Sequence, residues 1–225
     1  MPRVSRVVLA GVPFHVTQRG NRRSQVFFSD QNREIYLEWL REYAERCSVD
    51  ILAYCLMINH VHLVLVPSTS QGLARMLKPL HTRYAQNVNR AMGWKGHLWQ
   101  GRFFSSALDE MYLWAAVRYV ERNPVRAKII DRAEDYRWSS AAGHCGLTCD
   151  PVLTQDSHWQ RQFAGIGDWS AWLARGDEQA GLDTLRRNVQ AGIPCGSSSF
   201  VEALERDLGR PLRCQLQGRA KASRA

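Results

Sequence analysis

The stretch INHVHLVLV, residues 58–66, decides the fold of this chain. Side chains alternate between the two faces of a β-strand, so His60 and His62 share one face and the apolar residues share the other. The apolar face predicts a strand that packs on a hydrophobic core. The histidine face carries two imidazoles that can bind one divalent ion, although they fill only two of its coordination positions. A metal site here needs a further ligand, and without one the two residues are an ordinary histidine pair.

The segments around this strand predict an antiparallel sheet. Residues 51–57 are a second β-rich run, and the short Asn-containing turn before His60 predicts a hairpin that ends at Pro67. Residues 14–18 alternate as Phe-His-Val-Thr-Gln and run into the basic turn RGNRR, which indicates a half-buried strand. Residues 97–108, HLWQGRFFSSAL, indicate another strand or hairpin edge.

Helices are predicted between and after these strands. Apolar residues at three-and-four spacing predict helices over residues 30–44, 73–93 and 111–123. Pro79 predicts a kink or a late start in the second helix, and Pro124 is expected to end the third. Strands and helices that follow one another in this order, with an antiparallel hairpin, indicate an α+β fold.

Polar residues mark two of the predicted helix starts. Asp30 is expected to be the N-cap of the first helix, and Ser199-x-x-Glu202 is a capping box for a late helix that ends at Gly209. A further helical pattern covers about residues 177–189.

Composition and charge favour a polyanionic partner. The chain has 225 residues, of which 45% are hydrophobic, and its 30 Lys and Arg against 21 Asp and Glu leave a formal charge of +9. Such a basic excess is typical of proteins that bind nucleic acid, although it can also serve solubility alone. Six scattered cysteines without a C-x-x-C motif indicate reduced thiols and a cytoplasmic protein. No apolar run approaches the roughly 18–20 residues of a membrane span, so we expect no membrane association.

Changes in composition divide the chain into three predicted parts. Residues 1–145 carry the strand and helix pattern of a core domain, and residues 146–209 predict a helical appendage. Residues 210–225 form a basic tail without an acidic residue, which is typical of a flexible segment or of phosphate contact.

The segment RYVERNP supplies the side chains that the histidine pair lacks. Tyr119 and Asn123 are four residues apart on the predicted helix, so they emerge from one face about one turn apart. An amide oxygen can complete a His, His, Asn metal site, and a nearby phenol is a candidate nucleophile. Taken alone, the segment can equally be a core tyrosine and an asparagine at a helix end.

Binding of single-stranded DNA requires cations for phosphates and aromatic rings for unstacked bases. These residue types gather in the basic turn, the LWQGRF block, the tyrosine helix and the tail. The candidates are Arg19, Arg22, Arg23, Trp99, Arg102, Phe103, Arg118, Arg122, Arg126, Arg210 and Arg213. Any one of these cations can also be a solvated surface charge.

Four blocks of the sequence resemble a known family. His60-Val61-His62 is similar to the histidine-hydrophobe-histidine motif of HUH endonucleases, and YVERNP (119–124) resembles the catalytic-tyrosine helix of the REP-associated tyrosine transposases. The matching blocks are FHVTQRGNRR (14–23), NHVH (59–62), LWQGRF (98–103) and NPVRA (123–127). They occur in the same order and cover most of residues 10–140. The C-terminal helix and basic tail are similar to the family's DNA-recognition region, but less specifically.

The resemblance implies a ferredoxin-like α+β core that cleaves and rejoins single-stranded DNA. It implies that Tyr119 attacks the scissile phosphorus and forms a 5′-phosphotyrosine intermediate, while an ion on His60, His62 and Asn123 polarises the phosphate. Imidazoles alone would suit zinc, whereas the family's phosphate chemistry implies Mg²⁺ or Mn²⁺. The implied substrates are hairpins of repetitive extragenic palindromes, handled by a monomer at the nucleoid.

Two other functions stay open on the sequence. One is a non-catalytic DNA-binding regulator on the same fold, and the other is a metal-dependent hydrolase that uses water as its nucleophile. Tyr112 is the alternative nucleophile, because it lies two turns before Tyr119 on the same helix face. A separate structural zinc on His144, Cys145, Cys149 and His158 is a further alternative with loose ligand spacing.

Overall fold

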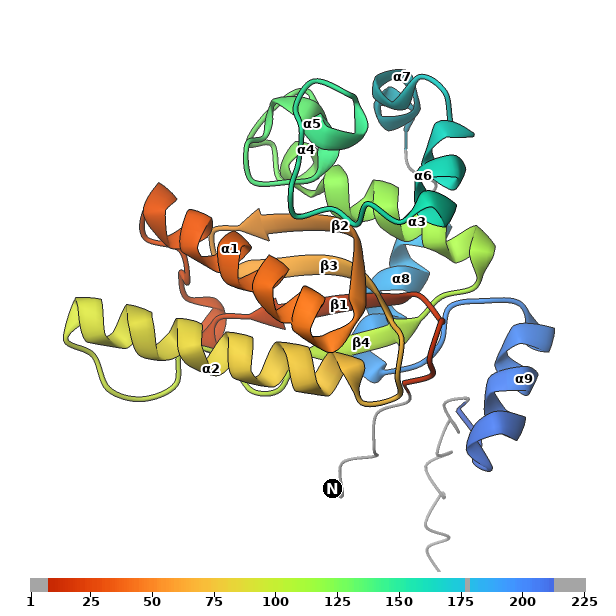
Figure 1. Ribbon diagram of the computed structural model, residues 1–225, viewed down its shortest axis with the longest axis horizontal. Helices are drawn as coiled ribbons and strands as arrows, with labels where there is room; N and C mark the ends of the chain where they lie inside the picture. The colour runs from red at the N-terminus through yellow and green to blue at the C-terminus, as the bar shows by residue number, and fades with distance from the viewer. Residues whose placement is uncertain (1–7, 177–178, 213–225) are drawn as a thin grey trace, which may run out of the picture.

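The predicted hairpin forms part of a four-stranded antiparallel sheet (Figure 1). The computed structural model describes residues 8–176 and 179–212. The strands are β1 (Phe14–Arg19), β2 (Val49–Met57), β3 (His60–Pro67) and β4 (Phe104–Ala107), in the order β2-β3-β1-β4. With helices α1 (Asp30–Cys47) and α2 (Gly72–Met92), the chain order is β1-α1-β2-β3-α2-β4, which is the ferredoxin-like arrangement. The predicted α+β fold is confirmed.

The strand register separates the apolar and the histidine faces of the sheet. In the antiparallel pair of β1 and β3, Thr17 lies opposite His62 and Arg19 lies opposite His60. Residues directly opposite each other share a face, so the odd-numbered residues of β1 lie on the histidine face. The other face presents Phe14 and Val16 beside the apolar residues of β3, and it belongs to the larger hydrophobic core.

Helices α1 and α2 cover the apolar face and confirm two predicted helices. Ser29 caps α1, because its hydroxyl accepts a hydrogen bond from the Asn32 N–H at 3.2 Å, so the expectation that Asp30 is the N-cap is wrong by one residue. Helix α2 begins at Gly72 and continues through Pro79 to its C-cap at Gly93. Pro79 therefore does not delay the helix, whose buried apolar residues outweigh the missing hydrogen bond.

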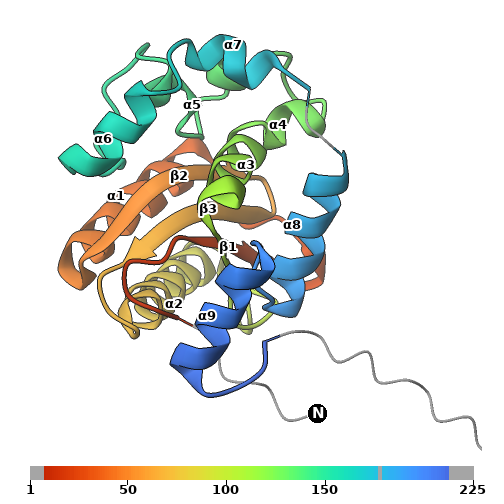
Figure 2. The ribbon, with the colours of Figure 1, turned by 90° about the vertical axis from the view of Figure 1, so that its right-hand side faces the viewer.

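The histidine face is covered by α3 (Glu110–Glu121) and α8 (Gln179–Ala191), which Figure 2 shows on the side of the sheet away from α1 and α2. Helix α3 packs on β1, β2 and β3, and α8 packs on β1, β4 and α3. A segment far along the chain thus completes the second helical layer. After α8 the chain returns to the end of β4, where the Cys195 N–H donates to the Ala107 carbonyl at 2.8 Å.

The predicted helix over 111–123 is split in the structure. Helix α3 ends at Glu121, and Asn123 opens the short helix α4 (Asn123–Arg126). Pro124 lacks the N–H that would continue α3, yet its fixed φ suits the first turn of a new helix. Tyr119 and Asn123 therefore lie on two consecutive helices rather than on one.

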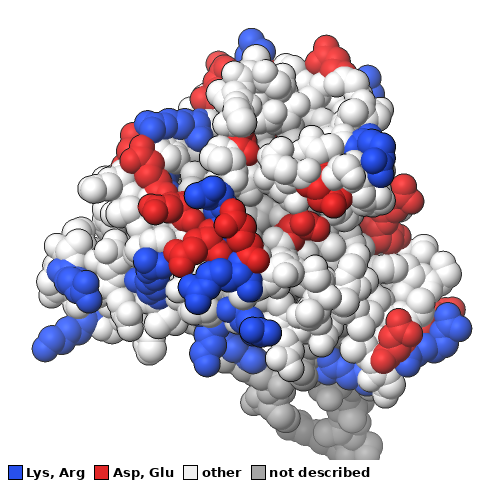
Figure 3. Space-filling model, viewed as in Figure 1, with Lys and Arg blue, Asp and Glu red and all other residues white. Residues whose placement is uncertain are grey.

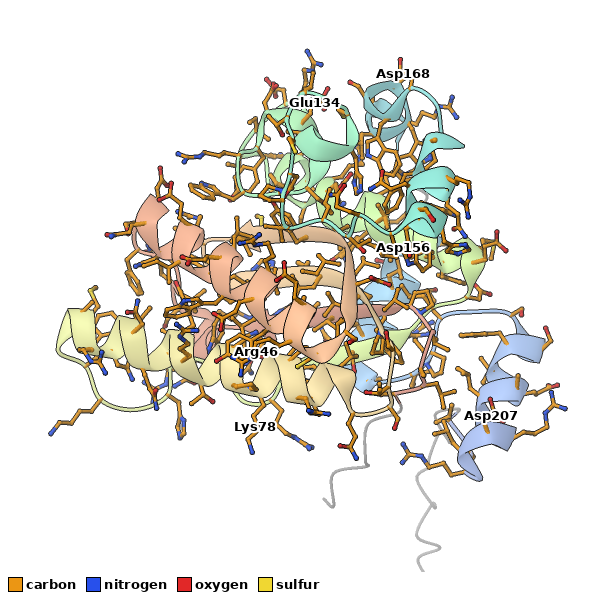
Figure 4. All side chains as sticks on the ribbon, viewed as in Figure 1. Arg46, Lys78, Glu134, Asp156, Asp168 and Asp207 are labelled. Carbon is orange, nitrogen blue, oxygen red and sulfur yellow. The ribbon has the colours of Figure 1, made fainter. Side chains whose placement is uncertain are left out.

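The elements after α4 form a module of short helices above the β2 edge of the sheet (Figure 1). They are η2 (Ala133–Asp135), α5 (Ala141–His144), α6 (Ser157–Ala164) and α7 (Trp169–Ala174). Figure 4 labels Glu134 and Asp168 in this module. The Ser170 hydroxyl donates to the Glu134 carboxylate, and Asp168 caps α7 by accepting from the Ala171 N–H. The bond between Ser170 and Glu134 joins α7 to η2.

The last described helix is α9 (Ser198–Leu208). Its N-cap is Ser197, which accepts from the Phe200 N–H at 3.2 Å, so the capping box predicted at Ser199 is wrong. The predicted end at Gly209 is confirmed, with φ of 62° in the left-handed region. Arg210 follows directly, while Arg213 and the rest of the basic tail lie outside the described residues.

The surface over α1 is of mixed charge. Figure 3 shows acidic side chains gathered there with basic ones around them, and Glu42 pairs with Arg46 and Arg83 at 3.1 and 3.0 Å. This face therefore offers no continuous basic surface to a polyanion. Over the ranges that the structure describes, no helix has the length and apolar character of a membrane span.

Candidate active site

The histidine pair lies at the start of β3 with its rings in edge contact. The centroids of His60 and His62 are 4.9 Å apart. Nδ1 of His60 lies 2.6 Å from the Asn59 side-chain oxygen, so Nε2 is the ring nitrogen that could bind a metal ion. Burial, with a smaller contribution from Arg19, lowers the pKa of His60 to about 4. Burial likewise holds the pKa of His62 well below its ordinary value. Both imidazoles are therefore neutral at pH 7, as a metal ligand must be.

A third histidine, His15 on β1, completes this cluster. Its Nε2 atom lies 2.9 Å from Nδ1 of His62, and the two rings stack at 5.2 Å with an interplanar angle of 19°. Burial, followed by the charge of Arg126, lowers the pKa of His15 to about 3. The contact occupies Nδ1 of His62 and orients its Nε2, as outer-shell partners do for metal-binding histidines.

Tyr119 packs directly against two of these histidines. Its ring makes edge contacts with His62 at 5.4 Å and with His15 at 5.5 Å, and the residue is 6% exposed. The geometry thus joins the candidate nucleophile on α3 to the candidate metal ligands on β3. Tyr112, the alternative nucleophile, is half-buried and lies two turns earlier on α3.

Asn123 contributes an amide with an unused donor. Its side-chain nitrogen is buried and has no hydrogen-bond partner among the described atoms. A buried amide group without a partner is costly, so such groups in native structures commonly serve a ligand or a site. The position of Asn123 at the first turn of α4, after the break at Arg122, sets the direction of this side chain.

Two arginines flank the Tyr119 ring. The guanidinium carbon of Arg126 lies 4.1 Å from the ring centroid, and its Nη2 donates to the Tyr119 carbonyl at 2.5 Å. The guanidinium carbon of Arg186, from α8, lies 5.7 Å from the same centroid. Arg126 was predicted from its place near the tyrosine, whereas Arg186 was not among the predicted site residues.

The basic turn of β1 lies beside His60. The Gly20 N–H donates to the Asn59 carbonyl at 2.9 Å, and the Asn59 side-chain N–H donates to the Arg23 carbonyl at 3.0 Å. A Cβ on Gly20 would lie 2.1 Å from the Ser24 carbonyl oxygen, so only glycine allows this close turn. Arg22 and Arg23 are exposed in the short helix η1 (Asn21–Arg23), and Arg19 is half-buried opposite His60.

The LWQGRF block forms one wall of a groove near the end of β1. The groove has a volume of about 760 Å³ and lies between α2 and residues 96–103. Trp99 and Phe103 are 7% and 6% exposed, and the Trp99 N–H donates to the His81 carbonyl. Little of either ring is left for stacking on a base, whereas Arg102 is exposed.

Arg118 and Arg122 contact the module that follows α4. Arg118 lies over the Trp172 ring at 5.3 Å and donates to the Gly176 carbonyl, and Arg122 donates to the Leu173 carbonyl. These bonds attach the end of α7 to α3. Their predicted contact with DNA stays a prediction.

A buried carboxylate two residues after Tyr119 ties α3 to the same module. Glu121 is fully buried and accepts from the Ser140 hydroxyl at 2.5 Å and from the Trp169 indole N–H at 2.8 Å. Nδ1 of His144 lies 2.6 Å from the same carboxylate. Three groups from different segments therefore depend on one side chain next to the candidate nucleophile.

We expect Glu121→Ala to lower the free energy of unfolding by about 3–5 kcal/mol, because it leaves the buried His144 and Trp169 groups without their acceptor and removes the shorter bond of Ser140. Urea unfolding followed by circular dichroism measures the change. Glu110→Ala on the same helix is the matched control, since Glu110 is exposed, and it should cost about 1 kcal/mol or less. Equal losses in the two variants would contradict a structural role for the Glu121 network.

The alternative zinc site is not formed. Within the described ranges, no group of three or more His, Cys, Asp or Glu side chains is arranged to hold a metal ion. His144 instead binds Glu121, and His158 lies on α6 with its Nε2 atom 2.9 Å from the Gln162 side-chain nitrogen.

Comparison with known families identifies the class of this fold and site. The family model described as "Transposase IS200 like" matches residues 9–123, just over half of the chain. The protein is thus a transposase by class. It belongs to the IS200-like transposase family. The matched range includes the histidine pair, Tyr119 and Asn123 and ends before α8.

One solved structure agrees with this assignment at the level of the fold. A REP-associated tyrosine transposase bound to a REP hairpin is 19% identical, with a TM-score of 0.55 over 70% of this chain and 93% of that chain. A putative transposase from Deinococcus radiodurans R1 is 20% identical, covers 56% of this chain and 92% of that chain, and has a TM-score of 0.38. No curated protein matches the sequence. The resemblance to REP-associated tyrosine transposases drawn from the motifs is confirmed by the family model and the shared fold.

Proposed function

We propose that this transposase is a metal-dependent transesterase that cleaves and rejoins single-stranded DNA at palindromic hairpins through a 5′-phosphotyrosine intermediate on Tyr119. The observation that carries the proposal is the contact of the Tyr119 ring with His62, at 5.4 Å, beside a second neutral histidine. A nucleophile in contact with candidate metal ligands favours covalent transfer over hydrolysis by water. The hairpin substrate is supported by the REP hairpin bound to the structural relative.

In the proposed reaction, the phenol oxygen of Tyr119 attacks the scissile phosphorus. The bond between phosphorus and the Tyr119 oxygen forms while the bond to the 3′ oxygen breaks. The phenol gives up its proton to solvent, and the departing 3′ oxygen takes up a proton to become a free hydroxyl. A 3′-hydroxyl can later reverse these steps on another strand, so rejoining needs no nucleotide hydrolysis.

The donor set fits Mg²⁺ or Mn²⁺ with phosphate oxygens as additional ligands. His60 and His62 are neutral, each has one ring nitrogen engaged by Asn59 or His15, and Asn123 at the first turn of α4 would offer its side-chain oxygen. His60, His62 and Asn123 would hold the ion. When bound, it would supply positive charge that polarises the scissile phosphate. His15 keeps His62 in one orientation through the contact of its Nε2 atom with Nδ1 of His62.

We also propose that the DNA passes over the end of β1. The exposed Arg22 and Arg23 lie beside His60, and the groove with Arg102 begins at the same strand end. None of the described residues that line the groove is Asp or Glu, and Lys78 on α2, labelled in Figure 4, adds a further cation. Such a lining suits a phosphate backbone.

Arg102→Ala is expected to weaken hairpin binding and to reduce the slope of log affinity against log salt by about 0.7–0.9, the value for one lost phosphate contact. Fluorescence anisotropy at several salt concentrations measures the slope. Arg41→Ala is the control, because Arg41 pairs with Glu45 on the mixed surface of α1. Identical slopes for the two variants would remove the groove from the DNA path. Removal of residues 210–225 tests the basic tail in the same assay, and it is expected to weaken hairpin affinity and to lower its salt dependence.

The function is tested by incubating the protein with a single-stranded palindromic hairpin and Mn²⁺ or Mg²⁺. Transesterification produces a protein–DNA adduct that survives denaturing electrophoresis and a free 3′-hydroxyl on the other fragment. Cleavage without an adduct would instead identify water as the nucleophile. Binding without cleavage, with every hairpin and both ions, would identify a regulator.

A further inference from the structure

We infer that Arg186, on α8, is a catalytic residue that binds the Tyr119 oxygen and then the phosphate attached to it. The inference rests on the proposed function and adds a residue from outside the range that the family model matches. It would make the C-terminal part of the chain a component of the active site.

The geometry brings the Arg186 guanidinium to the phenol end of the site. Its carbon lies 5.7 Å from the Tyr119 ring centroid, and a hydrogen bond to the Tyr119 phenol is the largest cause that raises the pKa of Arg186. Nη1 also lies 3.3 Å from the Asp183 carboxylate, one turn earlier on α8. The side chain of Arg186 is 41% exposed, so a DNA phosphate can reach it.

The fold fixes α8 in this position. Leu182, Leu185 and Val189 are buried on the side of α8 that meets the rest of the protein, and the helix packs on β4, β1 and α3. The Asn188 side-chain N–H donates to the Pro194 carbonyl at 2.9 Å. Arg186 is therefore presented by a rigid helix, and Asp183 restricts its guanidinium further.

The chemistry requires a cation at this place. Negative charge develops on the phenol oxygen as its proton leaves, and the product is a phosphodiester whose single negative charge is shared by two non-bridging oxygens. A guanidinium presents several N–H donors in a fixed planar fork, which can bind the oxygen first and the phosphate afterwards. Arg126 donates to the Tyr119 carbonyl and lies over the ring face, whereas Arg186 approaches the same ring from α8 and has its pKa raised by the Tyr119 phenol.

The experiment measures the single-turnover rate of adduct formation at saturating hairpin and Mn²⁺ for Arg186→Gln, Arg186→Lys and Arg187→Gln. Arg187 is the matched control, since it is the next residue of the same helix and is exposed. Hairpin affinity and melting temperature are measured in parallel. We expect Arg186→Gln to slow adduct formation by about 100-fold, as the loss of one charge-stabilising donor commonly does, with affinity changed less than about threefold. Arg186→Lys should recover part of the rate, and Arg187→Gln should match the wild type.

A double variant, Asp183→Asn with Arg186→Gln, separates the loss of the Arg186 cation from the effect of leaving the Asp183 carboxylate without its ion-pair partner. It should be as slow as Arg186→Gln alone, whereas a return to the wild-type rate would overturn the inference. The inference also fails if folded Arg186→Gln forms the adduct as fast as Arg187→Gln. If the wild-type protein forms no adduct, the proposed function itself is wrong, so the two failures are distinguishable.

Discussion

Tyr119→Phe is expected to abolish adduct formation, with a loss of about 10³-fold or more, while hairpin affinity stays within about twofold of the wild type. The substitution removes one oxygen from the nucleophile and keeps the ring that contacts His15 and His62. Denaturing electrophoresis of the protein with a labelled hairpin measures the adduct, and anisotropy measures the affinity. Loss of the phenol hydrogen bond should cost only about 0.5–1.5 kcal/mol of stability.

Tyr112→Phe is the matched control for this experiment. Tyr112 is half-buried on the same helix, so the change is chemically identical but lies away from the histidines. It should leave adduct formation unchanged. An adduct that persists in Tyr119→Phe and disappears in Tyr112→Phe would transfer the role of nucleophile to Tyr112.

His60→Ala is expected to lower metal-dependent cleavage by at least about 100-fold with little change in melting temperature. His60 is half-buried at the start of β3, and its Nδ1 contact with Asn59 is local, so its removal disturbs little of the core. Cleavage is measured against Mn²⁺ concentration. His158→Ala, an exposed histidine on α6, should behave as the wild type. Wild-type cleavage by folded His60→Ala at the same Mn²⁺ concentration would rule out the metal site.

His62→Ala is a less selective test of the same site. His62 is 2% exposed, stacks on His15 and contacts Tyr119, so its removal opens a cavity and leaves Nε2 of His15 unpaired. We expect it to lose cleavage and to be destabilised by about 2 kcal/mol or more. Destabilisation is therefore expected for His62→Ala and not for His60→Ala.

The alternation of residues 58–66 was sufficient to predict the central strand and its two faces. An apolar face must be buried and a strand has a period of two, so the side of each histidine follows from the sequence alone. The helices α1 and α2 followed from their apolar spacing for the same reason. Caps were less predictable, because Ser29 and Ser197 compete with equally good polar neighbours one or two residues away.

His15 could be placed on the polar side of its strand from the sequence, but not beside the histidine pair. It lies on an alternating strand, and pairing of that strand with β3 in the observed register places it on the histidine face. The missing information was the register of β1 against β3. A shift of this pairing by one residue would have placed His15 on the opposite face of the sheet, in the apolar core.

The local sequence established what each segment is: a two-faced histidine strand, amphipathic helices, and a helix break at Pro124 that follows from proline's missing N–H. The tertiary fold established which distant segments meet. Arg186 lies near Tyr119 although the two residues are 67 positions apart in the sequence. The reason is that α8 buries Leu182 and Leu185 by packing on β1 and β4 beside α3. The Glu121 network likewise joins α3 to segments from α5 and α7. Such contacts depend on how whole apolar faces are covered, which no local period of the sequence encodes.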